Sequence, residues 1–137
     1  MSENLDTIRR FLTFVNAQEL DAALALVAPD AELDWSRSEA PDGGIFAGGD
    51  TWRNWMTSRW EGLDGARFEL AELIDFPPDR AIIVAHMRAT GRSSGVEIGA
   101  LGASVVTLRN GKIAGITLYQ SKADALDALG SAGRGVE

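Results

Sequence analysis

The chain has 137 residues, of which 45% are hydrophobic and 24% charged, and it contains no cysteine. This length and composition are typical of one globular domain with its own core, and the lack of cysteine excludes disulfides, thiolate metal sites and a cysteine nucleophile. The net charge of −7 argues against a nucleic-acid partner, because such proteins usually present a basic face.

The first 36 residues predict two helices and a strand. Apolar residues recur at intervals of three and four in the first segment, which indicates an amphipathic helix. Its apolar stripe consists of Leu5, Ile8, Phe11, Leu12, Phe14 and Val15. A second, shorter helix is expected over Leu20 to Val27, because Pro29 cannot continue a helical hydrogen-bond ladder. Residues 31–36 alternate between apolar and polar, which predicts a short strand.

Residues 37–49 are rich in glycine, proline, aspartate and serine and predict a long loop. Long loops in compact domains are often functional, and two glycine pairs make this one a candidate lid. The next helix is expected to begin at Asp50, a favourable N-cap, and to end at Gly62. Large side chains gather on its surface at helical spacing: Trp52, Trp55, Met56 and Trp60.

From residue 66 the hydrophobic period changes to two, which predicts strands over 66–76, 81–92, 96–109 and 112–120. The first of them is expected to place Phe68, Leu70, Ile74 and Phe76 on one face. The short turns between these strands, among them Asn110-Gly111, require antiparallel neighbours. Ser121 is a candidate cap for a last helix ending at Gly130, and the tail 131–137 is expected to be disordered.

Together these elements predict one α+β domain over residues 1–130. We expect a cone-shaped fold in which helices cover one face of a curved antiparallel sheet and leave a cavity between the layers. The polar, acidic N-terminus has no signal-peptide pattern, and no apolar run approaches the roughly 20 residues of a membrane span. A cytoplasmic protein with no membrane and no nucleic-acid partner is therefore expected.

This order of elements, together with several local motifs, resembles the SnoaL-like family of the nuclear transport factor 2-like superfamily. The matching motifs are Phe14–Ala22, Ala28–Glu32, Ile45–Gly48, Arg109–Ile113, Tyr119 and Ala123–Leu126. The resemblance covers about residues 3–130 and implies the same cone-shaped fold. It implies no single activity, because this fold hosts isomerases, dehydratases, cyclases, epoxide hydrolases and non-catalytic binders.

Positions that hold catalytic groups in the steroid isomerases of this fold are changed in this chain. The isomerase tyrosine, aspartate base and protonated aspartic acid correspond, by resemblance, to Phe11, Trp35 and Ser104. Phenylalanine cannot donate a hydrogen bond, and tryptophan cannot accept a proton from carbon. The isomerase mechanism is therefore not expected.

Two further chemistries of the fold also lack a carboxylate here. Limonene-type epoxide hydrolases need two carboxylates bridged by an arginine. Leu118 stands at one carboxylate position, and no aspartate stands beside Arg88. Polyketide cyclases need an acidic residue near the end of the last strand, where this chain has Tyr119-Gln120-Ser121. These differences argue against epoxide hydrolysis and weaken cyclase chemistry without excluding it.

The polar candidates each have a functional and a structural interpretation. His86, the only histidine, is a candidate acid–base group, but it shares its strand parity with Arg88 and other polar residues, which favours the outer face. Ser104 is expected to face the cavity, where its hydroxyl bonds either a ligand or nearby backbone. One of Tyr119 and Gln120 should reach the cavity mouth, and the sequence does not decide which.

Two hypotheses for function stay open. In the first, the chain is a pocket protein for an apolar or aromatic compound, with lyase, isomerase or hydrolase character and without cofactor or metal. Its catalytic candidates are Ser104, Tyr119, His86 and Gln120. The predicted ligand-binding residues are Phe11, Trp35, Trp52, Trp55, Met56, Leu118 and Arg37.

In the second hypothesis the chain is a non-catalytic ligand-binding module or a homodimer. Its sheet would pair with a second copy through Arg88, Thr90, Glu97 and Thr107. The missing carboxylates favour this second hypothesis, because acid–base chemistry needs a titrating group in the pocket.

Overall fold

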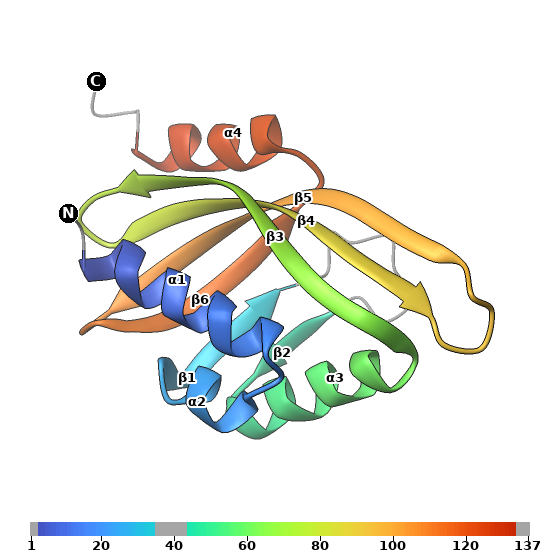
Figure 1. Ribbon diagram of the computed structural model, residues 1–137. Coiled ribbons are helices and arrows are strands. Elements are labelled where there is room, and N and C mark those ends of the chain that lie inside the picture. Colours follow the sequence, from blue (N-terminus) through green and yellow to red (C-terminus); the bar gives the residue numbers. More distant parts are fainter. Residues whose placement is uncertain (1–2, 35–43, 134–137) are drawn as a thin grey trace.

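The computed structural model describes residues 3–34 and 44–133, in which helices lie on both sides of one curved sheet (Figure 1). The elements follow in the order α1 (Glu3–Asn16), α2 (Leu20–Leu24), β1 (Val27–Asp34), β2 (Ile45–Ala47), α3 (Gly49–Glu61), β3 (Leu63–Phe76), β4 (Arg80–Gly91), β5 (Glu97–Arg109), β6 (Lys112–Tyr119) and α4 (Lys122–Gly133). The predicted α+β class and the curved sheet are confirmed.

The strands of the described residues form one sheet in the order β2-β1-β6-β5-β4-β3. Neighbouring strands are antiparallel except β1 and β6, which run parallel. The expected hairpin at Asn110-Gly111 is present, and both residues have positive φ angles, as a tight turn between antiparallel strands requires. β3 and β2 are left as the two edge strands.

The first core lies between the sheet and the helices α1 and α3, on the face that we call the inner face. Its helical residues include Ile8 and Phe11 from α1 and Trp52 from α3, all at most 4% exposed. Alternate residues of the central strands complete it, among them Ala81, Ile83 and Val106. The three-to-four spacing of α1 therefore buries its apolar stripe against the period-two stripe of the sheet.

A second core lies on the opposite, outer face, beneath α4. Ala125 and Leu129 of α4 pack against strand residues of the other parity, among them Ile82 and Val84. Figure 1 shows α4 on one side of the sheet and α1 and α3 on the other. The expectation that the helices share one face is wrong for α4. The apolar run Ala81–Ala85 is buried at every position and so supplies both faces.

The prediction that Phe68, Leu70, Ile74 and Phe76 share a face is also wrong. The pairing of β3 with β4 shifts between Leu70 and Glu72, so Ala71 has no partner residue on β4. Such a bulge inserts one residue and reverses the alternation beyond it. Phe68 consequently packs into the inner core, whereas Ile74 and Phe76 pack into the outer one.

The chain enters the sheet earlier than the helical pattern predicted. α2 ends at Leu24, and Val27 belongs to β1, where it pairs with Ile113 of β6. The backbone N–H of Ile113 also donates to the oxygen of Leu26 at 2.9 Å. Pairing with β6 therefore draws these apolar residues out of the helix. Pro29 fits within β1 because the register shifts between Val27 and Glu32.

Two other boundaries differ from the predictions. The predicted loop 37–49 contains β2, which pairs with β1, while its residues 37–43 lie outside the described part of the chain. α4 continues past Gly130 to Gly133, and residues 134–137 also lie outside that part. Within residues 3–34 and 44–133, no helix has the length and apolarity that crossing a bilayer requires.

Candidate functional site

Ser104 lies on the inner face at the centre of the sheet. It stands opposite Leu118 of β6 on one side and Ile83 of β4 on the other, so all three side chains point to the inner face. Ser104 is half-buried, and its hydroxyl has no hydrogen-bond partner among the described residues. A buried serine usually bonds nearby backbone, and this one does not. Its hydroxyl is therefore available to a molecule that contacts this wall.

The inner-face residues around Ser104 are apolar, and those in the next row have small side chains or none. Gly102 and Ala85 stand opposite each other in the next row of the inner face. A Cβ atom on Gly102 would meet Cδ1 of Leu118 at 3.3 Å, so the absence of a side chain at this position lets Leu118 lie flat against β5. Leu118 is half-buried. Gly102 is a position that sequence reasoning missed, and a glycine inside a strand was the available signal.

The helices α1 and α3 contribute aromatic residues to the core on the same inner face. The rings of Phe11 and Trp52 meet edge to face with centroids 6.3 Å apart. Trp52 has no exposed surface, and its indole N–H donates to the backbone oxygen of Ala31 at 3.1 Å. Met56, one turn further along α3, is 9% exposed. Phe11 and Trp52 were both predicted to bind a ligand. They are thus part of the packed core and expose almost no surface to one.

A second aromatic pair lies nearer the surface. Phe46 of β2 stands opposite Leu33 on the inner face, and its ring centroid is 5.7 Å from that of Trp55. Both aromatic residues are half-buried. Phe46 was not singled out from the sequence, because it was assigned to a loop. Trp35 and Arg37, also predicted to bind a ligand, lie outside the described residues.

The structure does not bring the four catalytic candidates together. His86 stands between Glu69 and Leu101, and its residue parity is that of Val84 in the outer core. Tyr119 also packs against the outer core, opposite Ala103. Because successive side chains of a strand point to opposite faces, neither residue shares a face with Ser104. Gln120 follows the end of β6 and is exposed.

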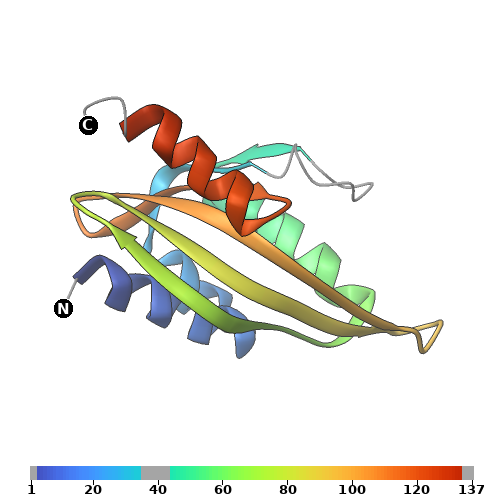
Figure 2. The ribbon, with the colours of Figure 1, turned by 90° about the horizontal axis from the view of Figure 1, so that it is seen from above.

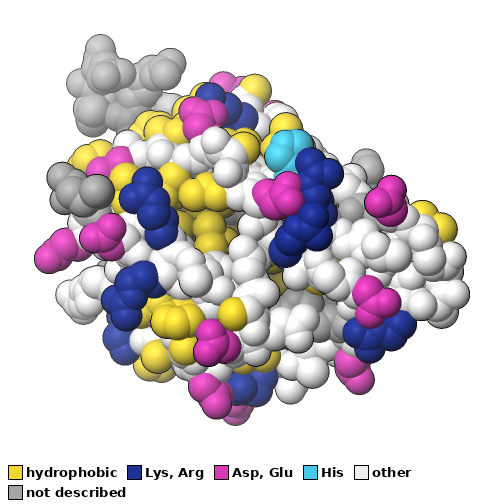
Figure 3. Space-filling model, in the orientation of Figure 1, with side chains coloured by type: hydrophobic (Ala, Val, Ile, Leu, Met, Phe, Trp, Pro, Cys, Tyr) yellow, Lys and Arg dark blue, Asp and Glu magenta, His cyan; other side chains and the backbone are white. Residues whose placement is uncertain are grey.

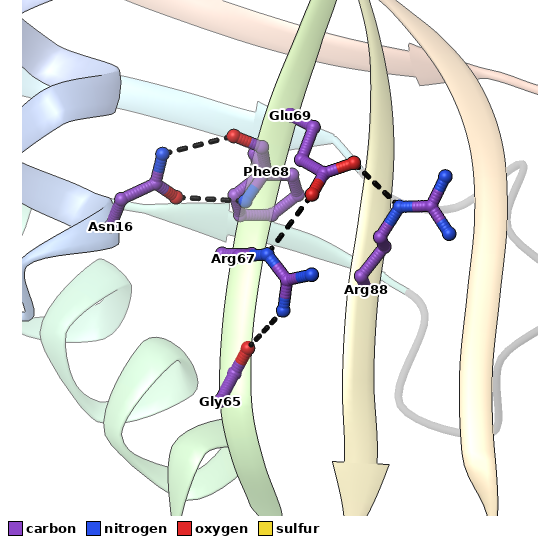
Figure 4. A network of polar contacts seen from close by, with 6 residues as sticks. All are labelled: Asn16, Gly65, Arg67, Phe68, Glu69 and Arg88. Carbon is purple, nitrogen blue, oxygen red and sulfur yellow. Dashed lines mark hydrogen bonds and ion pairs between the residues drawn. The ribbon is translucent and has the colours of Figure 1, made fainter.

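A group of ionisable residues from β3 and β4 lies on the outer face, away from Ser104. Glu69 accepts hydrogen bonds from Arg88 at 2.5 Å and from Arg67 at 3.1 Å, as Figure 4 shows. The bond from Arg88, and secondarily that from Arg67, lowers the pKa of the Glu69 carboxyl, although desolvation opposes the shift. In Figure 3 the histidine lies beside acidic and basic side chains, and the strand register places His86 opposite Glu69.

On the inner face of β3 to β6, Asp75 is the one acidic residue among the described positions. It stands opposite Ala81 in a different row from Ser104, and its Oδ1 atom is buried without a hydrogen-bond partner. Within the described residues, no three His, Asp or Glu side chains are grouped as metal ligands. Figure 3 also shows a hollow in which hydrophobic side chains gather, between the positions of α1 and α4 in Figure 1.

Comparison with known families gives one match. The sequence model of the SnoaL-like domain matches residues 8–116, which is most of the chain and includes both Phe11 and Ser104. No curated protein matches the chain at a significant level.

Several solved structures share the fold. A nuclear transport factor 2-like protein from Burkholderia thailandensis is 23% identical, with a TM-score of 0.77 over 94% of this chain and 98% of that one. TerC, co-crystallised with polyporic acid, is 18% identical, with a TM-score of 0.76 over 92% and 97% of the two chains. A Mycobacterium tuberculosis protein in complex with estradiol-17beta-hemisuccinate is 16% identical, with a TM-score of 0.76 over 90% and 97%.

Proposed function

This chain belongs to the SnoaL-like domain family, and we propose that it binds a small apolar or aromatic molecule against the inner face of its sheet, with Ser104 as the polar contact. The observation that supports this is the half-buried Ser104 hydroxyl, which lacks a hydrogen-bond partner among the described residues and lies on an apolar wall. Ligand pockets typically combine such walls with a few polar groups that orient the ligand.

The surroundings of Ser104 favour an uncharged ligand. Leu118 and Ile83 flank the serine across the sheet, and Gly102 and Val106 flank it along the strand on the same face. Burying a charge against such a wall without an opposite charge is costly, whereas one hydroxyl or carbonyl group can pair with the serine. The expected ligand is therefore apolar, with one hydrogen-bonding oxygen directed at Ser104.

Two neighbours of the same fold support the binding of a small organic molecule, one co-crystallised with polyporic acid and one in complex with estradiol-17beta-hemisuccinate. The test is tryptophan fluorescence of this chain against a library of small apolar and aromatic compounds. Half-buried Trp55 is the expected reporter. A library in which no compound changes the emission would contradict the proposal.

A matched pair of variants then tests whether the ligand contacts the Ser104 hydroxyl. Ser104→Ala removes the inner-face hydroxyl, and Thr117→Val removes a hydroxyl from the outer face, where Thr117 stands opposite Val105. Loss of affinity in the first variant and not in the second is the expected result. Equal losses in both variants would mean that the inner face is not where the ligand binds.

The placement of the candidates favours binding over lyase, isomerase or hydrolase activity. General acid–base catalysis needs a titrating group within reach of the substrate. His86 and Tyr119 are on the face opposite Ser104. Asp75, an acidic residue of the inner face, stands two strands away from Ser104 in another row. The expected outcome is that a compound bound by the protein is recovered unchanged, which mass spectrometry of the incubated mixture would test.

We also propose self-association through the part of the outer face that α4 leaves uncovered. Figure 2 shows the β4–β5 hairpin reaching well beyond α4. Arg88, Thr90 and Glu97 belong to this region, and Leu101 there is 56% exposed. Thr107, also proposed for this contact, is on the same outer face opposite Arg80, and the rows packed under α4 separate it from the other three residues. Leu101→Glu should lower the sedimenting mass if this surface pairs two copies.

A further inference from the structure

β3 forms one edge of the sheet over 14 residues, Leu63–Phe76. On the side away from β4, the backbone N–H and C=O groups of an edge strand are open to another strand. Long regular edges of this kind are common sites of unwanted pairing between chains, and proteins usually obstruct them. The question for this chain is which part of the β3 edge is regular enough to pair.

Two irregularities confine that part to a short window. The pairing of β3 with β4 shifts once between Asp64 and Arg67 and again between Leu70 and Glu72. Bulges bend a strand and increase its local twist, which makes the flanking segments poor templates. Between them, residues 67–70 keep a regular register with β4. This window, residues 67–70, is the pairing-competent part of the edge.

Asn16, at the C-terminal end of α1, occupies the middle of the window. Its side-chain nitrogen donates to the oxygen of Phe68 at 2.9 Å, and its side-chain oxygen accepts from the nitrogen of Phe68 at 2.7 Å. Figure 4 shows the two bonds side by side. One side-chain amide therefore makes the pair of bonds that a residue of an antiparallel neighbour would make with Phe68.

We propose that the window is a strand-pairing site for a second copy of this chain, and that Asn16 holds it closed. The charges of the window support a second copy as the occupant. In an antiparallel pair with a two-fold axis at Phe68, Arg67 stands opposite the partner's Glu69, and Glu69 opposite the partner's Arg67. Opposite charges at directly opposed positions stabilise a strand pair, and a two-fold axis makes the contact twice.

The exposed apolar surface of the window also supports pairing with a second copy. Leu70 is 42% exposed at this edge, and it is one of the few large hydrophobic residues of the described chain with so much open surface. In the pair described, Leu70 would stand opposite the partner's Ala66, so pairing would cover part of its open surface. Asn16 thus occupies an edge that carries both an exposed apolar residue and complementary charges.

The test is the mass of Asn16→Ala by sedimentation velocity over a concentration series. Both chains of the comparison carry Leu101→Glu, so that pairing through the outer face does not contribute. With Asn16→Ala a species of twice the mass of one chain is expected, and the chain that keeps Asn16 should not form it. Thr13→Ala is the matched control, because Thr13 is also exposed on α1 and its hydroxyl donates to the backbone oxygen of Arg9 in the same helix. Equal masses for Asn16→Ala and Thr13→Ala would overturn the proposal.

Two further measurements separate pairing through the window from unfolding or general aggregation. Adding Arg67→Glu to Asn16→Ala places a glutamate at position 67 of one chain opposite Glu69 of the other. This repulsion should reduce the fraction of the double-mass species. An unchanged fraction would contradict pairing at this edge. If Asn16→Ala does not fold, Asn16→Ser replaces it, because a serine side chain is too short to make both bonds to Phe68. The Phe68 amide should then exchange more slowly as the protein concentration rises, and exchange independent of concentration counts against the proposal.

Discussion

The indole nitrogen of Trp52 donates a 3.1 Å hydrogen bond to the backbone oxygen of Ala31, and both residues are fully buried. The same oxygen accepts the backbone N–H of Gly48 at 3.0 Å. One carbonyl of β1 therefore holds both the residue before α3 and a fully buried tryptophan of that helix. This arrangement makes Trp52 part of the packing that sets the distance between α3 and the sheet.

Replacing Trp52 with phenylalanine should destabilise the protein markedly. The change removes a buried hydrogen bond and leaves a void beside Phe11, at an expected cost of about 2–4 kcal/mol in the free energy of unfolding. Chemical denaturation followed by circular dichroism measures this. Trp55→Phe on the same helix is the control, because Trp55 is only half-buried, and its loss of stability should be clearly smaller. Similar losses would mean that the Ala31 bond contributes little.

Deleting Ala71 should prevent normal folding. Without this residue the bulge closes, and Ile74 and Phe76 turn from the outer core toward α1, while the residues between them turn outward. We expect a loss of more than about 4 kcal/mol, seen as loss of the cooperative unfolding transition. Ala71→Ser keeps the extra residue at an exposed position and should change stability little. A deletion variant that unfolds like the parent chain would show that the register adapts.

Ser104→Ala should discriminate between ligands. For a compound with a hydroxyl or carbonyl group, the lost hydrogen bond should weaken binding about fivefold to tenfold, which corresponds to about 1 kcal/mol. For the hydrocarbon analogue of the same shape, affinity should stay the same or increase slightly. Fluorescence titration of both compounds against both proteins measures the difference. Parallel changes for the two compounds would mean that the hydroxyl does not contact the ligand oxygen.

The Glu69 carboxyl should titrate below its ordinary range in the folded protein, because Arg88 donates a hydrogen bond to its charged form. Since this pKa is lower in the folded than in the unfolded state, the ionised carboxylate stabilises the fold above its ordinary pKa. That contribution is lost as the pH falls through the lowered value.

Carboxyl chemical shifts followed by NMR from neutral to acid pH measure the Glu69 titration. Arg88→Ala should raise the pKa of Glu69, and Arg67→Ala should raise it less, because Arg88 is the larger cause of the shift. A larger effect from Arg67 would reverse the assignment of the two arginines.

The period of the hydrophobic pattern predicted α1, α3 and the long strands because these elements depend on regular local spacing. The reversal of parity at Ala71 was not predictable in the same way, since one unpaired alanine looks like any other residue of an alternating strand. The position of α4 on the outer face could have been inferred from the sequence of β4. Ala81–Ala85 is apolar at five successive positions, which is typical of a strand buried on both faces.

The candidate site was predicted in part. The family resemblance placed Ser104 toward the cavity, and the register puts it on the inner face. Strand alternation placed His86 on the outer face, where it lies next to Glu69. The role of Trp52 was harder to foresee, because helical spacing gives the side of α3 on which a residue lies and not how deeply it is buried. That depth depends on a contact with Ala31, which is 21 residues away along the chain.

The two cores share the central strands but not their side chains. Ile83 contributes to one core and its neighbours Ile82 and Val84 to the other. Substitutions of inner-face side chains around Ser104 therefore leave the residues packed beneath α4 unchanged. Such a division should let the inner wall vary during evolution or redesign while the outer core continues to hold the sheet together.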